Sequence, residues 1–318
     1  MKKSAPYILL FFFIITLVGC NHDEPQGTTI LIANNSGDGI YRATNFGTFI
    51  PSNAGLNGNG KYVRCFLDRG FEVLIGTKDG VYKSSDNGSS WKAINTGIGA
   101  TSKQITSLME IKGKVYAGSF GGGVYISENN GGKWEAKSSG LAAEGLKVSG
   151  LLYHNEVLYA ATYNGMYRLE GDSWKEVNNG LTDQEDKTVV GITSKGSEVF
   201  IATSGRGVKK SKDKGENWID LNEGLPDLMV NSIYANDTTL LIGTSEKGVY
   251  RYADKTWKDL NNGLTEPGKK IRSIAAKKGV MVIGTVGGAI YHSDDNGFSW
   301  EETSGNAITG DVWGILIR

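Results

Sequence analysis

The fold of this chain is decided by one stretch of sequence, VLIGTKDGVYKSSDNGSSW, which runs from Val73 to Trp91. It combines an apolar run, a glycine-containing turn, a second short run, a polar turn and a tryptophan. Further copies run from Val115 to Trp134, Leu158 to Trp174, Val199 to Trp218, Leu240 to Trp257 and Met281 to Trp300. A degenerate copy without the tryptophan, Thr29 to Phe49, brings the number to seven. A period of about 40 residues indicates an array or a propeller.

Each repeat contains four short alternating or β-branched runs separated by glycine-rich turns, the pattern of a four-stranded antiparallel blade. In the third repeat these runs are residues 105–111, 114–119, 123–127 and 133–137. Such a sheet is apolar on both faces and cannot bury them alone, so the blades must stack, and closing the stack into a ring protects its ends.

The two ends of the chain predict how the ring closes. The first repeat begins directly at its second strand, near Thr28, and has no first strand of its own. Residues 311–317 align with the first strands that begin at Val63, Ile105, Val148, Val189, Val230 and Ile271. We therefore predict an all-β fold over residues 28–318: a seven-bladed propeller of four-stranded antiparallel blades, closed when the C-terminal strand joins the N-terminal blade. In the same alignment Cys65 falls where the other repeats have serine or glycine, which favours a small packed residue over a reactive thiol.

The N-terminal segment predicts export and lipid anchoring. Two lysines precede an apolar run from Tyr7 to Val18, shorter than the roughly 20 residues that a membrane-spanning helix needs. The run ends in Leu17-Val18-Gly19-Cys20, which resembles a bacterial lipobox. We expect residues 1–19 to be a lipoprotein signal peptide, Cys20 to be lipidated and residues 20–27 to be a tether; an ordinary signal with an incidental cysteine is the alternative. The expected location is the cell envelope, at the outer membrane facing the periplasm or the surface, with membrane contact through the lipid alone.

Composition and spacing argue against several classes of function. The chain has 34 basic and 34 acidic residues, so no overall charge favours nucleic acid. The three histidines, at positions 22, 154 and 292, are isolated, and no zinc-ligand spacing is present. The glycines at 121–123 lie in a predicted hairpin, not before a helix, so they do not form a phosphate loop. We expect no cofactor, no metal and no nucleic-acid partner.

Four repeats carry the pattern Ser-x-Asp/Asn-x-Gly-x-x-Trp before the outermost run, beginning at Ser84, Ser127, Ser211 and Ser293. It resembles the Asp box, or BNR repeat, of sialidases, sortilin-type receptors, two-propeller xyloglucanases and the photosystem II stability and assembly factor. In such a turn the Asp or Asn oxygen accepts backbone N–H groups and the glycine adopts positive φ. Because each turn supplies one carboxylate or none, a folding role is favoured over calcium binding.

Propeller families generally place their sites on the face opposite these Ser-x-Asp/Asn turns. That face is formed by the loops between second and third strands and by the links between blades. The predicted first strands bring Arg64, Asn231, Arg272 and Trp313 near the channel mouth, and the loops bring Phe120, Tyr163 and Arg206. Two arginines beside a tryptophan suit a carboxylate, a phosphate or a sugar ring. The alternative is that these residues are a solvated rim and one core tryptophan.

The sequence favours a non-catalytic, monomeric binding or assembly propeller that recognises a protein or glycan partner. Seven blades and the absence of an Arg-Ile-Pro motif argue against a sialidase. A glycoside hydrolase of the Asp-box type is the alternative, and it would need two carboxylates across a cleft. The candidates Asp79, Asp183, Asp186, Asp227 and Glu246 fall in no recognisable catalytic motif.

Overall fold

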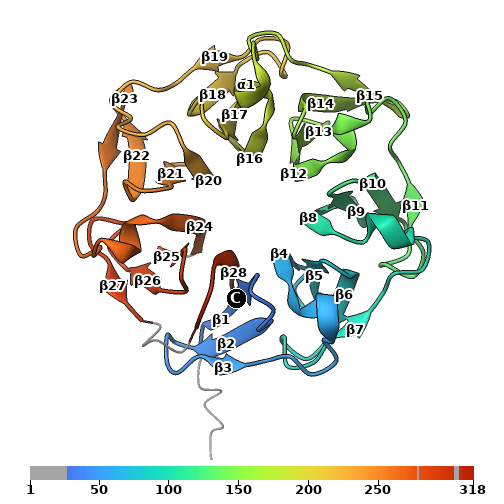
Figure 1. Ribbon diagram of the computed structural model, residues 1–318, viewed down its shortest axis with the longest axis horizontal. Helices are drawn as coiled ribbons and strands as arrows, with labels where there is room; N and C mark the ends of the chain where they lie inside the picture. The colour runs from blue at the N-terminus through green and yellow to red at the C-terminus, as the bar shows by residue number, and fades with distance from the viewer. Residues whose placement is uncertain (1–26, 278, 304–307) are drawn as a thin grey trace, which may run out of the picture.

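The computed structural model describes residues 27–277, 279–303 and 308–318, and they form seven four-stranded antiparallel sheets around a central channel (Figure 1). The predicted seven-bladed propeller is therefore confirmed. The predicted signal peptide and Cys20 lie outside the described residues. Within the described part of the chain, no helix is long and apolar enough to cross a membrane.

Each blade runs from an innermost strand at the channel to a short outermost strand at the rim. Blades 1 to 4, innermost strand first, consist of β28 (Val312–Ile317), β1 (Thr29–Asn34), β2 (Ile40–Thr44) and β3 (Ile50–Pro51); β4 (Val63–Asp68), β5 (Val73–Thr77), β6 (Gly80–Ser84) and β7 (Lys92–Ala93); β8 (Ile105–Ile111), β9 (Lys114–Ser119), β10 (Gly123–Ser127) and β11 (Glu135–Ala136); β12 (Val148–His154), β13 (Val157–Thr162), β14 (Gly165–Glu170) and β15 (Ser173–Glu176).

Blades 5 to 7 repeat this order. They consist of β16 (Val189–Lys195), β17 (Glu198–Thr203), β18 (Val208–Ser211) and β19 (Ile219–Asp220); β20 (Val230–Ala235), β21 (Leu240–Thr244), β22 (Val249–Ala253) and β23 (Thr256–Asp259); β24 (Ile271–Lys277), β25 (Val280–Thr285), β26 (Ile290–Ser293) and β27 (Glu301–Glu302). Short helices lie in five links between blades: η1 (Gly58–Lys61), η2 (Ala100–Ser102), η3 (Glu144–Leu146), α1 (Gln184–Lys187) and η4 (Pro267–Lys269). The outermost strand of blade 3 is shorter than the predicted run 133–137.

The ring closes as predicted, by pairing the two ends of the chain in blade 1. β28 runs antiparallel to β1, with Ile30 opposite Ile317 and Ile32 opposite Ile315. The backbone groups of Thr29 and Arg318 continue the ladder, with N···O distances of 3.1 and 2.8 Å. Blade 1 therefore takes one strand from each end of the sequence, and it lies where the two ends meet in Figure 1.

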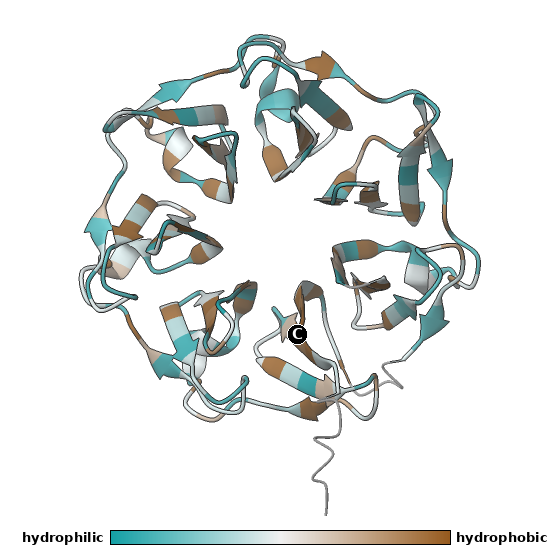
Figure 2. Ribbon diagram, turned by 180° about the vertical axis from the view of Figure 1, so that it is seen from behind, coloured by the Kyte–Doolittle hydropathy of each residue, from teal (hydrophilic) through white to brown (hydrophobic). Residues whose placement is uncertain are grey.

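The core lies between the blades, and a tryptophan anchors six of the seven interfaces. The indole N–H of Trp91 donates to the Ser52 carbonyl of the preceding blade at 2.9 Å. The other five repeat tryptophans, which lie just before an outermost strand or, at Trp174 and Trp257, within it, do the same to their own preceding blades at 2.6 to 2.8 Å. Phe49, buried just before β3, takes the corresponding place between blades 7 and 1. Figure 2 shows the apolar residues along the inner strands and hydrophilic residues at the rim.

The Ser-x-Asp turns are held by side-chain hydrogen bonds. The Ser84 hydroxyl donates to Asp86 at 2.7 Å and accepts the N–H of Gly88 at 2.8 Å, while Asp86 accepts the N–H of Ser90 at 2.9 Å. Gly88 has a φ of 82°. The turns at Asn129, Asp213 and Asp295 repeat the pattern. These side chains replace missing backbone partners in a tight turn, which supports the folding role expected from the sequence.

Candidate functional site

Each innermost strand carries a β-bulge at its second residue. In β4, Val63 pairs with Thr77 and Cys65 with Gly76, so Arg64 has no residue opposite it. The same shift occurs in the other six blades. A bulge re-aims its side chain. All seven bulged residues line one cavity of about 370 Å³ at the channel mouth: Arg64, Thr106, Ser149, Val190, Asn231, Arg272 and Trp313.

Three of the polar bulged residues hold neighbouring blades together. Each donates to the carbonyl of the first residue in the next innermost strand: Thr106 to Val148 at 2.6 Å, Ser149 to Val189 at 2.6 Å and Asn231 to Ile271 at 2.9 Å. Asn231 also accepts from the Ser245 hydroxyl at 3.2 Å. The predicted site residue Asn231 does line the cavity, but its amide is used in blade-to-blade bonding.

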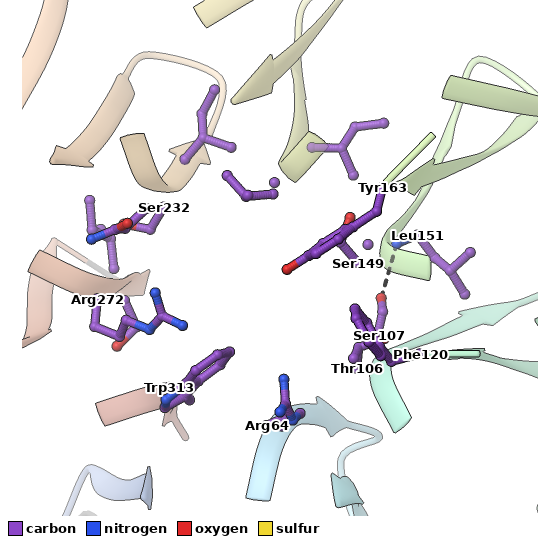
Figure 3. A pocket seen from close by; sticks show the side chains of 18 residues that line it. Arg64, Thr106, Ser107, Phe120, Ser149, Leu151, Tyr163, Ser232, Arg272 and Trp313 are labelled. Atoms are coloured by element: carbon purple, nitrogen blue, oxygen red, sulfur yellow. Dashed lines mark hydrogen bonds between the residues drawn. The ribbon is translucent and has the colours of Figure 1, made fainter. Parts of the chain in front are cut away.

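Arg64, Arg272 and Trp313 form a second group of bulged residues and make no such bond. The guanidinium carbon of Arg272 lies 3.6 Å from the centroid of the Trp313 ring, and that of Arg64 lies 4.6 Å from it. The indole therefore stands between two cations that come from blades 7 and 2 (Figure 3). Among the described residues, neither guanidinium has a hydrogen bond or an ion pair, so their N–H groups are available to a ligand.

The arginines are partly buried and make no ion pair among the described residues, although the desolvation of Arg272 is offset in part by the charge of Asp311. Desolvation lowers the pKa of both, and the charge of Arg272 lowers the pKa of Arg64 further. An arginine still stays protonated, because its ordinary pKa lies above 12. The electrostatic free-energy cost of holding two positive charges together falls when an anion binds between them. This part of the cavity is therefore an anion site by electrostatics as well as by hydrogen-bonding capacity.

Two aromatic side chains line the cavity on blades 3 and 4, next to the blade of Arg64 and across from that of Arg272. Phe120 follows β9 and Tyr163 follows β13, and their rings meet edge to face with centroids 5.1 Å apart. Tyr163 is 36% exposed, and its hydroxyl points into the cavity (Figure 3). The cavity therefore has a cationic side on blades 7, 1 and 2 and an aromatic side on blades 3 and 4.

Lys78 is a further cation near Arg64 that does not line the cavity and was not among the predicted site residues. Its ammonium lies 4.0 Å from the centroid of the Tyr62 ring, and no ion pair holds it among the described residues. Burial and the nearby charge of Arg64 lower the pKa of Lys78. The signal was present in the repeat alignment, because Lys78 follows its second strand as Phe120 and Tyr163 follow theirs.

Arg206 is separated from the other predicted site residues. Its guanidinium binds Asp183 at 2.7 Å and Glu185 at 3.1 Å, on the link that carries α1, and it does not line the cavity. The structure thus brings together six of the seven residues: Arg64, Phe120, Tyr163, Asn231, Arg272 and Trp313. Arg206 is already paired with two carboxylates of its own chain.

The carboxylates considered for hydrolysis do not meet in this cavity, whose described lining includes no aspartate or glutamate. Most of them are bound elsewhere to basic residues: Asp79 to Lys103, Asp183 to Arg206, Asp186 to Lys209 and Glu246 to Lys270. Among the described residues, no group of three or more His, Cys, Asp or Glu side chains is placed to hold a metal ion. The geometry supports binding of an anion more directly than it supports acid–base chemistry.

Comparison with solved structures places the chain among other propellers. It is similar to YCF48 bound to D1 peptide, at 14% identity and a TM-score of 0.58, covering 85% of this chain and 93% of that one. A GH74 enzyme of Niastella koreensis gives 16% identity and a TM-score of 0.61, covering 79% of this chain and 46% of the enzyme. The extracellular domain of a hybrid two-component system of B. thetaiotaomicron gives 14% and 0.58, covering 82% of this chain and 38% of that one.

These identities show a shared fold alone, and the chain spans less than half of the last two proteins. Among proteins with curated functions, no sequence matches this chain. One family model, described as the DUF6242 β-propeller domain, matches residues 65–309, from the innermost strand of blade 2 to the end of the link that follows blade 7. The chain therefore belongs to the DUF6242 β-propeller family.

Proposed function

We propose that this protein is a non-catalytic binding propeller, anchored at the cell envelope, that holds an anionic group of a protein or glycan partner in its channel mouth. One observation carries the proposal: Arg64 and Arg272 flank Trp313, line the cavity and make no ion pair among the described residues. Arg69, Arg168 and Arg206 each bind a carboxylate of their own chain. Arg42 and Arg251 also make no ion pair among the described residues, but only Arg64 and Arg272 line the cavity, where they are placed to receive a carboxylate from outside.

The structural neighbours include both kinds of protein that the sequence left open. YCF48 was solved with a peptide bound and matches over nearly its whole length, which supports a binding role for a propeller of this size. The GH74 neighbour favours the alternative of a glycoside hydrolase. Hydrolysis would need two carboxylates facing one another across the ligand. Because the cavity lining supplies none, binding is the function that we propose, with the propeller acting as a monomer.

The test is a ligand screen of the propeller, residues 28–318, which contain all seven blades and both closing strands. Acidic and neutral oligosaccharides and acidic and neutral peptides are arrayed against wild-type protein and against the Arg64→Gln, Arg272→Gln double variant. Arg251→Gln is the matched control, because Arg251 also lies over an aromatic ring, Phe298, at 4.8 Å, but outside the cavity.

We expect the ligands to be anionic, and to bind wild-type protein and the control but not the double variant. Release of saccharide product would establish the hydrolase instead. Equal binding of all three proteins to every ligand would show that the channel mouth is not the site.

A further inference from the structure

The channel mouth contains an unusual concentration of buried donors without a partner. In the described part of the chain, seven buried side-chain polar atoms make no hydrogen bond. Three of them belong to residues that line this one cavity: Arg64 Nε, Ser232 Oγ and Trp313 Nε1. All three can donate a hydrogen bond. Buried donors are normally satisfied, and an exception calls for an explanation such as a ligand.

These donors lie on different blades, so one small anion cannot meet them all. The Ser232 hydroxyl packs beside Gly243 and Ile271, away from the cavity, but Trp313 belongs to blade 1, Arg64 to blade 2 and Tyr163, whose hydroxyl points into the cavity, to blade 4. The ligand must therefore carry several acceptor oxygens spread over a ring-sized body, with a charged group at the side that faces Arg64 and Arg272. A carboxylate suits that side, because a planar guanidinium edge can donate two parallel hydrogen bonds to it.

The rest of the cavity suits a saturated ring. Tyr163 and Phe120 supply aromatic surface on blades 3 and 4, and the C–H groups of a sugar carry the partial positive charge that aromatic faces attract. Small residues, Gly150, Gly191 and Ser273, line the same cavity and leave room beside the aromatic rings. A volume of about 370 Å³ lies at the lower end of the range found for small-ligand pockets, enough for one or two sugar residues.

We infer that the ligand held at this site is a saccharide that carries a hexuronic acid residue. Its carboxylate lies between Arg64 and Arg272, and its hydroxyl oxygens accept from Trp313 Nε1 and the Tyr163 hydroxyl. This inference rests on the proposed function and names the class of partner. An acidic peptide is the weaker candidate, because an Asp or Glu side chain presents a carboxylate on a narrow methylene stem and leaves the Tyr163 hydroxyl of blade 4 unmet.

The experiment is calorimetric titration of residues 28–318 with four defined probes: trigalacturonate, its methyl ester, galactotriose and an acidic hexapeptide. The methyl ester keeps the ring and the oxygens but removes the negative charge. We expect trigalacturonate to bind at least tenfold more tightly than its ester, and galactotriose to bind no better than the ester. The same titrations with a glucuronic-acid trisaccharide and a sulfated trisaccharide separate a carboxylate from other anions.

Three variants locate the binding. Arg272→Met is expected to remove the preference for the acid over the ester, whereas Arg251→Met, the matched control, leaves it unchanged. Tyr163→Phe is expected to weaken trigalacturonate binding threefold to tenfold without disturbing the fold, because it removes only a hydroxyl that points into the cavity.

The outcomes separate this inference from the proposed function. If only the peptide or the sulfated sugar binds, and Arg272→Met abolishes that binding, the uronate is wrong and the anion-binding propeller stands. If uronates bind equally well to wild-type protein and Arg272→Met, the site assignment is wrong. If the folded protein binds none of the six probes, the uronate inference is overturned, and the ligand screen above decides the proposed function separately.

Discussion

The ammonium of Lys277 lies 3.3 Å from the carboxylate of Asp68, although the two residues are 209 positions apart in sequence. Lys277 ends the innermost strand of blade 7, and Asp68 ends that of blade 2. Asp68 also binds the guanidinium of Arg318, the residue after β28 in blade 1, at 3.3 Å. One carboxylate therefore joins three consecutive blades across the seam where the two ends of the chain meet.

Removal of residues 311–318 is expected to prevent the ring from closing. The deletion removes β28, and with it the partner of Ile30 and Ile32, both fully buried in the intact ring. An open β1 edge with an apolar face favours aggregation. Size-exclusion chromatography and near-UV circular dichroism should show aggregated or unfolded protein.

The matched control for that deletion is Asp68→Asn, which breaks the two ion pairs but keeps the strand. Because the three side chains are partly exposed, we expect it to lower the free energy of unfolding by no more than about 1 kcal/mol. A deletion variant as stable as Asp68→Asn would contradict the closure mechanism.

The Arg272→Met substitution should leave the propeller as stable as before or make it more stable. The variant removes a partly buried charge that makes no ion pair among the described residues, and it loses a cation–π contact of about 1 kcal/mol and the attraction of Asp311. Residues kept for binding often cost stability in this way. Thermal unfolding followed by circular dichroism measures the effect. A fall in Tm of more than about 8 °C would show instead that Arg272 is a structural residue.

The repeat made most of the fold predictable from sequence. Repeated copies of one sequence unit predict how the blades pack, because each Trp-containing turn packs against the preceding blade. The place of Phe49 in the interface between blades 7 and 1 is less visible, because only its position just before an outermost strand relates it to the tryptophans. The predicted lipid anchor at Cys20 stays a prediction.

The site was predictable only in part, for reasons that lie in particular residues. The sequence placed Arg64, Arg272 and Trp313 near the channel mouth, but strand alternation alone does not reveal that each is a bulged residue. Arg206 was grouped with them because its loop is equivalent to those of Phe120 and Tyr163. Its partner Glu185 lies in α1, whereas the other links between blades hold 3-10 turns or no described helix. The repeat alignment therefore could not predict this ion pair.

Acid is expected to weaken the Ser-x-Asp turns. Hydrogen bonds from Ser299 and Ser293 lower the pKa of Asp295 to about 2, below its ordinary value near 4. Because the folded-state pKa is the lower one, this carboxylate contributes its stability fully above pH 4 and loses it as the pH falls towards 2. Asp213 behaves in the same direction through hydrogen bonds from Asn217.

The variant that tests this is Asp295→Asn, which makes the turn resemble the one at Asn129 in blade 3. Asn129 accepts the N–H of Lys133 at 2.8 Å without any charge. We expect the variant to fold at pH 7 and to show a smaller drop in Tm than wild-type protein between pH 5 and pH 2.5. An identical pH profile for the two proteins would show that Asp295 does not contribute to acid sensitivity.

Cys65 is expected to resist thiol reagents in the folded propeller. Its thiol packs with Leu67 and Ile94 against the core between blades 2 and 3, and burial raises its pKa to about 12. At pH 8 only about one thiol in ten thousand would be ionised, and the thiolate is the reactive form.

Because Cys65 is the only cysteine in residues 28–318, the labelling stoichiometry reports on it directly. We expect almost no reaction with a disulfide reagent at pH 8 in buffer and one equivalent in guanidinium. Cys65→Ser, which copies Ser107 and Ser273 of other blades, should fold and abolish labelling in both conditions; rapid labelling of the native protein would show that the blade opens at this position.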